Sequence, residues 1–277
     1  SDAKPCRMAD GSYRYIVNPT ATATKITGSY AGGSKEFTFT PSATTGSYKT
    51  YKIDGGGVVV KQYNLQVGDY FLADGNLLPK ETDEATVKNA DVAAIGIVLK
   101  AGRDTEGDWT DNGDYKLKGS ATSMSEVHGY VLALRDAHDG CQWGSFETKV
   151  GCDRNQTTGF NGYSSTQTIV AKVQGGNLQD AAYYATTGYE AQYPAPANTS
   201  GWFLPSGGQC QYWLNHRDVI LRNVQNAGGD GWKDWYWSSS EPSYDPASSA
   251  YSWDMRDGYM YSDYKNYGNA VRACLAF

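Results

Sequence analysis

The sequence predicts an α+β fold in which strands and loops outnumber helices. Charged residues make up only 19% of the 277 residues, while the chain holds 32 glycines and 22 tyrosines, a composition more typical of strands and loops than of helix bundles. Short apolar runs of strand length recur along the chain. One stretch, Ser206 to Ala227, instead carries apolar residues at three-to-four spacing, which predicts a helix.

The N-terminal segment is predicted to hold four short strands. They are Tyr13–Val17, Thr24–Tyr30, Glu36–Thr40 and Tyr48–Ile53, bounded by proline and glycine. Because a two-sheet sandwich needs about seven strands, we expect an incomplete β module, completed by earlier chain or by a donated strand. The run Gly55-Gly56-Gly57 is interpreted as a linker, which divides the chain into residues 1–56 and 57–277. In the alternative interpretation, the four strands extend the sheet of the larger domain.

The larger segment begins with strands and continues with two predicted helices. Four apolar runs have strand length: Val58–Val60, Val67–Phe71, Ala93–Leu99 and Gly129–Leu134. A short amphipathic helix is predicted over Asn177–Tyr184, before the long one that starts at Ser206. Ser206 and Gln209 form a capping box, which satisfies amides of the first helical turn, and Gly228-Gly229 ends the long helix.

The dipeptide Asp257-Gly258 predicts a two-residue hairpin turn near the C-terminus. Such a turn sets four opposing pairs: Arg256 with Tyr259, Met255 with Met260, Asp254 with Tyr261, and Trp253 with Ser262. Alternation along the strands places Trp253, Met255 and Met260 on one face, which we expect to be buried. The opposite face, which we expect to meet solvent or a partner, carries Ser252, Asp254, Arg256, Tyr259, Tyr261 and Asp263.

Tyrosines on this hairpin predict a binding surface. A tyrosine offers a large contact area and a hydroxyl while only two side-chain torsions are fixed, so a cluster of them favours recognition; the alternative is a sheet face that only meets water. The candidate ligand-binding residues are Tyr244, Asp245, Ser252, Asp254, Arg256, Tyr259, Tyr261, Asp263, Tyr264 and Tyr267. Four tryptophans in or beside predicted elements are expected in the core instead: Trp202, Trp213, Trp237 and Trp253.

Composition and motifs argue against nucleic acid binding, membrane insertion and catalysis. A net charge of −6 leaves no basic stripe for phosphates, and no apolar run approaches the roughly eighteen residues of a membrane span. The histidines His128, His138 and His216 fall in different predicted elements without a catalytic motif; His216 is expected to be a surface or capping residue.

No cofactor is expected, and the one candidate metal site is an acidic loop. A calcium ion could use oxygen ligands from this loop, which lacks the spacing of an EF-hand; the alternative is simple solvation. The acidic residues of the loop are Asp104, Glu106, Asp108, Asp111 and Asp114.

Motifs in the last third of the chain resemble those of a known family. They are Gly201-Trp202-Phe203-Leu204-Pro205-Ser206, Tyr236-Trp237-Ser238-Ser239-Ser240-Glu241, Lys265-Asn266 and the terminal Val271–Phe277. The pattern resembles the C-type-lectin-like surface domains of gut-bacterial fimbrillin-type proteins and the variable proteins of diversity-generating retroelements. The resemblance weakens toward Val58, and the N-terminal segment is only loosely similar to a fimbrillin-like, immunoglobulin-type module.

The resemblance implies a ligand-binding, adhesin-like protein that is secreted or displayed on a bacterial cell surface. It implies a C-type-lectin-like domain with small antiparallel sheets and two helices, whose closing strand pairs near its first strand, after a partial immunoglobulin-like β module. The ligand would be a protein or a glycan on a cell or phage surface.

The resemblance also implies that adenine-directed mutagenesis diversifies the final hairpin. The segment from Tyr236 to Asn269 is correspondingly rich in Tyr, Ser, Asp and Asn. Two alternatives to the ligand-binding function belong to other classes of protein: a structural fimbrial subunit without its own ligand, and a formylglycine-generating-type oxidase.

The five cysteines are interpreted as structural thiols or disulfides. Cys210 and Cys274 stand where the resembling domains usually have aliphatic residues, so a disulfide between them would lock the hairpin to the scaffold; two independent buried thiols are the alternative. In the oxidase alternative, Cys210 and Cys274 would be the cysteine pair that such oxidases use. Cys141 and Cys152 form the other candidate disulfide, and Cys6 is left free or paired outside this sequence.

Overall fold

The structure, a computed structural model, describes the chain from Pro5 except residues 8–12, 18–23, 31–32, 40–46, 55–56, 105–114, 153–157 and 174–178. For residues 5–62 and for Val173 it describes the backbone alone.

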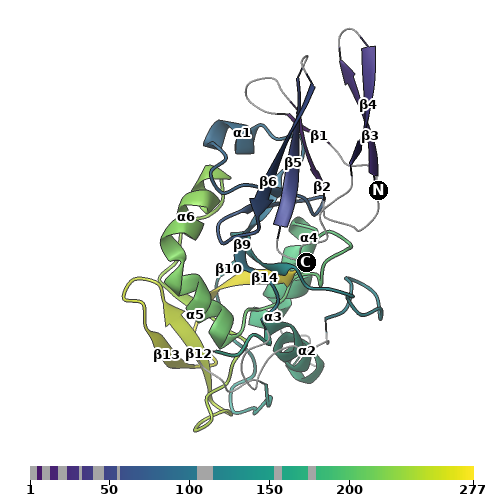
Figure 1. Ribbon diagram of the computed structural model, residues 1–277. Helices are drawn as coiled ribbons and strands as arrows, with labels where there is room; N and C mark the ends of the chain where they lie inside the picture. Colours follow the sequence, from purple (N-terminus) through teal and green to yellow (C-terminus); the bar gives the residue numbers. More distant parts are fainter. Residues whose placement is uncertain are drawn as a thin grey trace.

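One eight-stranded sheet organises the C-terminal part of the chain (Figure 1). In sheet order its strands are β13 (Met260–Tyr264), β12 (Ser249–Asp254), β11 (Trp235–Trp237), β14 (Asn269–Ala276), β10 (Gly129–Cys141), β9 (Ala94–Ala101), β7 (Tyr70–Leu72) and β8 (Leu77–Leu78). Its neighbours are antiparallel except β11 and β14, which run parallel at Tyr236 and Ala270. The α+β class is confirmed. Small antiparallel sheets were expected; the structure has one larger, mostly antiparallel sheet, because β11 joins the C-terminal hairpin to β14.

Helices lie on both sides of β10 and β14 (Figure 1). They are α1 (Glu84–Lys88), α2 (Gly162–Val173), α3 (Ala181–Tyr183), the π-helical turn η2 (Tyr184–Gly188), α4 (Tyr189–Gln192), α5 (Gly207–Asn215) and α6 (Arg217–Asn226). The expectation of two helices is therefore too low. The predicted short helix over Asn177–Tyr184 starts later, since Asp180 caps it by accepting from the Tyr183 amide at 2.8 Å.

The predicted long helix is two helices with a break at His216. The capping box is confirmed: Ser206 caps α5, and its amide donates to Gln209 Oε1 at 2.8 Å. His216 ends α5 and precedes α6 with non-helical backbone angles. Gly228 follows α6 with a φ of 74°, a left-handed conformation that glycine adopts without steric cost.

The N-terminal strands form their own sheet and a separate ribbon. The sheet has the order β1-β2-β5-β6, and β3 and β4 form a two-stranded ribbon. Their bounds are β1 (Pro5–Arg7), β2 (Tyr13–Val17), β3 (Thr24–Tyr30), β4 (Gly33–Phe39), β5 (Ser47–Asp54) and β6 (Gly57–Asn64). Asp54 at the end of β5 pairs with Gly57 at the start of β6, so Gly57 belongs to a strand, whereas Gly55 and Gly56 lie outside the described residues. The division into two domains stays a prediction.

The core confirms the expected tryptophans and adds a buried ion pair. Trp202, Trp213, Trp237 and Trp253 are all buried. Arg272 on β14 pairs with Asp136 on β10, Nε to Oδ1 at 2.7 Å, and both side chains are buried. The Tyr236 hydroxyl donates to the same carboxylate oxygen at 2.8 Å. These bonds join β10, β11 and β14 at the centre of the sheet.

Neither expected disulfide is present. Cys141, Cys210 and Cys274 carry free, buried thiols, which excludes both the Cys210–Cys274 and the Cys141–Cys152 bond from this structure; the Cys6 side chain lies outside the described residues. Burial raises the pKa of the Cys141 thiol to about 12, and it also raises the pKa values of the Cys210 and Cys274 thiols. A reactive cysteine needs an accessible thiolate, so Cys210 and Cys274 do not suit the oxidase alternative.

Candidate ligand-binding surface

The β12–β13 hairpin has the predicted faces but a register shifted by two residues. Trp253 pairs with Met260, where Ser262 was expected. The turn is longer than two residues, because the Asp254 amide donates to the Tyr259 carbonyl at 3.0 Å and encloses the four residues between them. Since side chains alternate with a period of two, a shift of two leaves each one on its predicted face. Trp253 and Met255 are accordingly buried and Met260 is partly buried.

Two predicted ligand-binding residues are structural instead. Ser252 is buried because β12 lies between β11 and β13, and its hydroxyl donates to Asp263 Oδ2 at 2.6 Å. Asp254 is buried and holds Arg256, which donates from Nε at 3.0 Å and Nη2 at 2.7 Å. These bonds lower the pKa of the Asp254 carboxyl. Both residues were expected on an open face, and the error comes from taking the hairpin as an isolated pair of strands.

The side chains around the turn form what we call the turn cluster: the exposed Arg256, Asp257, Tyr259 and Tyr261, and the partly buried Trp235. The Tyr261 hydroxyl donates to Asp257 Oδ2 at 2.8 Å, which raises the pKa of that phenol. Its ring meets the Trp235 ring edge-on, with centroids 4.9 Å apart. The Tyr259 amide donates to Asp257 Oδ1 at 2.9 Å. The Asp257 carboxylate therefore holds the backbone of Tyr259 and the side chain of Tyr261.

A second group, the distal cluster, lies at the other end of β13 and consists of Phe146, Tyr264 and Tyr267. The centroid of the Tyr264 ring lies 5.9 Å from that of Phe146 and 5.6 Å from that of Tyr267, and both ring pairs meet edge-on. The structure thus divides the predicted surface into two aromatic groups along one edge strand. Phe146 was missed from the sequence, because it lies in a loop more than a hundred residues before the hairpin.

The remaining predicted site residues are Tyr244, Asp245 and Asp263. Tyr244 is strongly exposed in the loop between β11 and β12. Asp245 in the same loop is a turn residue, since Oδ2 accepts from the Ser249 hydroxyl at 3.1 Å. Asp263 is partly buried and accepts from Ser252 and, at 2.9 Å, from Asn269 Nδ2. Asp245 and Asp263 therefore support the loops more than they offer free carboxylates.

A fully buried ion pair lies below the distal cluster. Lys265 Nζ lies 2.6 Å from Glu241 Oε1, and neither side chain is exposed. Nζ also donates to the carbonyls of Thr148 and Pro246, while Glu241 accepts from the amides of Val150 and Gly151. Burial lowers the pKa of the Lys265 ammonium, and the Glu241 carboxylate opposes that effect. The pair ties together the loops that carry Phe146 and Tyr244.

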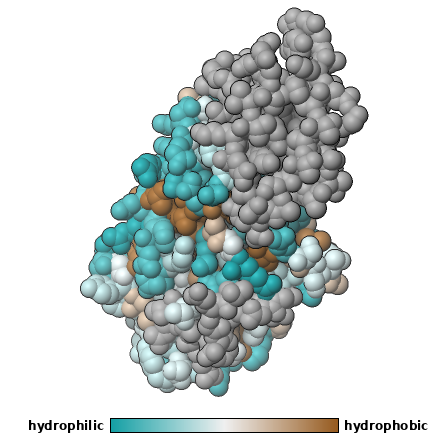
Figure 2. All heavy atoms as spheres, in the orientation of Figure 1, coloured by the Kyte–Doolittle hydropathy of each residue, from teal (hydrophilic) through white to brown (hydrophobic). Residues whose placement is uncertain are grey.

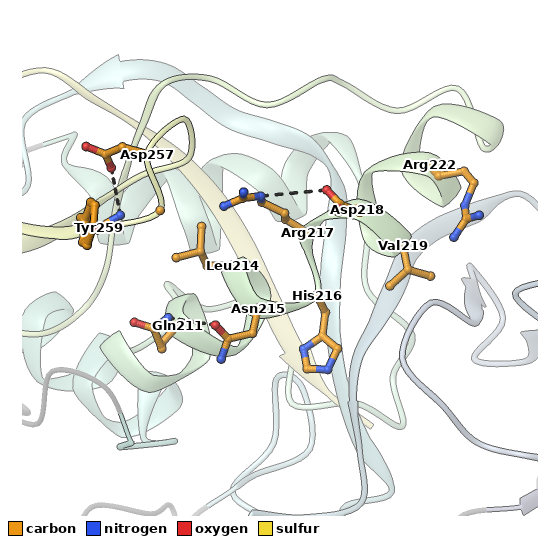
Figure 3. A pocket seen from close by; sticks show the side chains of 11 residues that line it. Gln211, Leu214, Asn215, His216, Arg217, Asp218, Val219, Arg222, Asp257 and Tyr259 are labelled. Carbon is orange, nitrogen blue, oxygen red and sulfur yellow. Dashed lines mark hydrogen bonds and ion pairs between the residues drawn. The ribbon is translucent and has the colours of Figure 1, made fainter.

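An open pocket of about 670 Å³ lies between the turn and the α5–α6 junction (Figure 3). The turn contributes Asp257, Gly258 and Tyr259. The helices contribute Gln211, Leu214, Asn215, His216, Arg217, Asp218, Val219 and Arg222. The expected capping role of His216 agrees with its position between the helices, where its ring stacks on Tyr212 at 4.3 Å. The pocket was not predicted, because it depends on how the hairpin meets the helix junction.

Among the described residues, no group of three His, Cys, Asp or Glu side chains is placed to hold a metal ion. Asp104 of the acidic loop pairs with Lys100 at 3.2 Å, whereas Glu106, Asp108, Asp111 and Asp114 lie outside the described residues, so the calcium hypothesis is not tested. Within the same described part of the chain, the helices are too short and too polar to span a bilayer.

The comparisons with known proteins point to fimbrial proteins. No protein-family model matches the chain. It is 26% identical over 234 residues to a Bacteroides ovatus protein assigned as the fimbrium tip subunit Fim1C, and the match covers 71% of this chain and 42% of that protein. A crystal structure of a Bacteroides ovatus fimbrial protein matches with a TM-score of 0.57 and 15% identity, over 93% of this chain and 65% of that one.

The chain has the fold of a Bacteroides fimbrial protein. It is similar in sequence to a fimbrium tip subunit and spans less than half of that relative's length. This similarity confirms the expected cell-surface location. The finer assignment to C-type-lectin-like domains remains a prediction.

Proposed function

We propose that the chain acts as a fimbrium-tip-like surface protein that recognises a ligand through the turn cluster and the distal cluster. One observation carries the proposal: Tyr244, Tyr259, Tyr261, Tyr264 and Tyr267 are between 40% and 71% exposed. Large aromatic side chains are enriched at the centres of binding interfaces and often supply most of their energy. The end of the molecule that carries β12 and β13 shows mostly pale, intermediate hydropathy, whereas teal spheres surround a brown patch in the region along α6 (Figure 2).

The surface is ordered before it meets a ligand. Asp254 holds Arg256, Asp257 holds Tyr261, and the Lys265–Glu241 pair holds the loops below the distal cluster. Ordering a flexible side chain on binding costs about 0.5–1.5 kcal/mol, and side chains fixed in advance avoid much of that cost. Recognition would then rest on shape and hydrogen bonding, without a chemical step.

Two finer features belong to the same proposal. The first is a C-type-lectin-like arrangement, which the closing strand β14 supports by lying between β11 and β10 inside the sheet. The second is diversification of the hairpin by a retroelement. It would act on exposed positions such as Arg256, Tyr259 and Tyr261, while Trp253 maintains the scaffold. A neighbouring reverse-transcriptase gene, with a near-copy of the segment that encodes residues 236–277, would support diversification; without them, that part of the proposal fails.

A structural role within a fimbrium is the second candidate function, and the similarity to fimbrial proteins favours it. The chain would then contact only other subunits of its assembly. The two functions differ in whether the isolated protein binds a foreign surface.

The test is binding of the purified chain to gut-bacterial cells, phage particles and immobilised mucin glycans. We expect binding to at least one of these surfaces, and a loss of about tenfold or more in affinity when Tyr259 and Tyr261, or Tyr264 and Tyr267, are changed to alanine, since each pair would remove at least about 1.4 kcal/mol. Gln225→Ala on the exposed side of α6 is the matched control. If the tyrosine variants bind as the wild type does, the proposed surface is wrong. If no foreign surface is bound, the structural role is the better account.

A further inference from the structure

We infer that the pocket between the turn and the α5–α6 junction is a subsite for a short oligosaccharide. This inference rests on the proposed function and deepens it, because it names a ligand class and adds residues outside the hairpin. The pocket volume of about 670 Å³ falls within the range of about 300–1,000 Å³ that is usual for small-ligand sites. Tyr259 belongs both to the turn cluster and to the pocket lining, so a ligand could contact both.

The helix side of the pocket offers planar hydrogen-bonding groups. Gln211 Nε2 donates to Asn215 Oδ1 at 3.1 Å (Figure 3), a bond that leaves the Asn215 amide donors and the Gln211 carbonyl oxygen for other partners. Neighbouring hydroxyls of a sugar ring both donate and accept, so amide pairs of this kind match them. A hydroxyl can donate to the carbonyl oxygen of an amide side chain or accept from its NH₂ group.

The cations of the pocket are weakly paired. Arg217 Nε lies 4.0 Å from the exposed Asp218 carboxylate, a separation and exposure at which an ion pair contributes little. For Arg222 the described residues provide no ion pair. Asp257, the carboxylate on the turn side, already accepts from the Tyr259 amide and the Tyr261 hydroxyl. The pocket therefore presents unused donors on Arg217 and Arg222 beside the exposed Asp218 carboxylate. Such a mixture suits hydroxyl groups, which both donate and accept.

The apolar part of the pocket is small and suits one face of a sugar ring. The Tyr259 ring is exposed and can cover the C–H face of a pyranose. Leu214 and Val219 add limited apolar surface, and Leu214 is largely buried by its own neighbours. A peptide ligand would need deeper apolar pockets for its anchoring side chains, and a nucleic acid would need an excess of cations that this pocket lacks. Of these ligand classes, the oligosaccharide fits best.

Gly258 connects the hairpin to the pocket. Its φ is 83°, and a Cβ at this position would lie 3.1 Å from Arg217 Nη1. Because Gly258 has no side chain, the Arg217 guanidinium can rest against the turn. The position of Arg217 and the shape of the turn are thereby coupled.

The experiment is a screen of the full chain against an array of immobilised neutral and acidic mono- to hexasaccharides. Any sugar that is retained is followed by titration of the free saccharide. We expect Asn215→Ala and Arg217→Ala each to weaken binding by about tenfold, the loss expected for a hydrogen bond to a charged or amide group. Gln225→Ala, which lies on α6 outside the pocket, should leave affinity unchanged. Thermal unfolding of each variant establishes that the fold is intact.

Two outcomes overturn the inference while the proposed function stands. In the first, cells or particles are bound in a Tyr261-dependent manner and the array retains no sugar. In the second, a sugar is retained but Asn215→Ala and Arg217→Ala, both folded, bind it as the wild type does. If neither cells nor sugars are bound, the proposed function fails together with the inference.

Discussion

Lys265 Nζ and Glu241 Oε1 lie 2.6 Å apart in a site that excludes solvent from both side chains. The ammonium lies 4.4 Å from the centroid of the Trp143 ring and donates to two loop carbonyls. Burying two charges carries a large desolvation cost, so such a pair is kept only where all its hydrogen bonds are made. Here those bonds hold three loop segments beside the exposed tyrosines.

Removing one partner of this pair should strongly destabilise the chain. We expect Lys265→Met to lower the free energy of unfolding by about 3–5 kcal/mol, because Glu241 would remain as an uncompensated buried charge. Denaturant unfolding measures the change. Lys88→Met is the control: its partner Glu84 and Lys88 itself are both exposed, and we expect a change below about 1 kcal/mol. Equal effects of the two substitutions would contradict the structural role of the buried pair.

A methyl group at Gly258 should disturb the turn. The φ of 83° at this residue strains any residue with a Cβ, so Gly258→Ala should cost about 1–2 kcal/mol in unfolding free energy. Gly231→Ala is the matched control, since a Cβ there would meet nothing within 4 Å and the change should stay within about 0.5 kcal/mol. Both values come from thermal or denaturant unfolding. A Gly258→Ala variant as stable as the wild type would mean that the turn has another conformation.

The Asp180 cap predicts a pH dependence of stability. Burial raises the pKa of Asp180 to about 6 from 3.8, so the folded state holds this proton more tightly than the unfolded state. Protonation of Asp180 therefore stabilises the folded state fully below about pH 3.8, and this stabilisation is lost as the pH rises to about 6. Asp180→Asn keeps a cap and removes the charge. Its unfolding free energy should therefore exceed that of the wild type at pH 7, by up to about 3 kcal/mol.

The comparison of Asp180→Asn with the wild type is made by urea unfolding at pH 4 and pH 7. The difference between the two proteins should shrink toward pH 4. A difference that is the same at both values would show that the carboxyl does not titrate in this range.

The thiols of Cys210 and Cys274 should react only after unfolding. Both are fully buried and carry no disulfide. Alkylation of the folded, unreduced protein should leave them unmodified, and alkylation in denaturant without reductant should modify both, as read by peptide mass spectrometry. If these two cysteines stay unmodified in denaturant until a reductant is added, a disulfide joins them and the structure is wrong on this point.

The sequence predicted the two faces of the hairpin, but neither which residues oppose each other nor the burial of Ser252 and Asp254. Alternation decides the face of Trp253 and Tyr261, and that pattern is local. The register depends on the turn, and the bonds between Asp254 and Arg256 favour a longer turn than the Asp257-Gly258 dipeptide indicates. The burial of Ser252 depends on β11, a strand that pairs with β12 only in the folded sheet.

Long-range pairing explains the other differences. The capping box at Ser206 was predictable because its partners are three residues apart. The break at His216 has no proline or glycine to mark it, and periodicity continues across it. Glu241 and Lys265, like Arg272 and Asp136, are far apart in sequence, and no local pattern pairs them. The pocket combines α5, α6 and the turn, so it too arises only from the packing of distant segments.

Nitration of tyrosines, with and without a bound target surface, tests the central claim most directly. On the free protein, tetranitromethane should modify the exposed Tyr244, Tyr259, Tyr261, Tyr264 and Tyr267, and spare the buried Tyr236 and Tyr251. On protein bound to cells, particles or glycan, mass spectrometry should find the turn-cluster and distal-cluster tyrosines protected. Equal nitration of these residues in free and bound protein, with protection elsewhere on the chain, would contradict the proposed recognition surface.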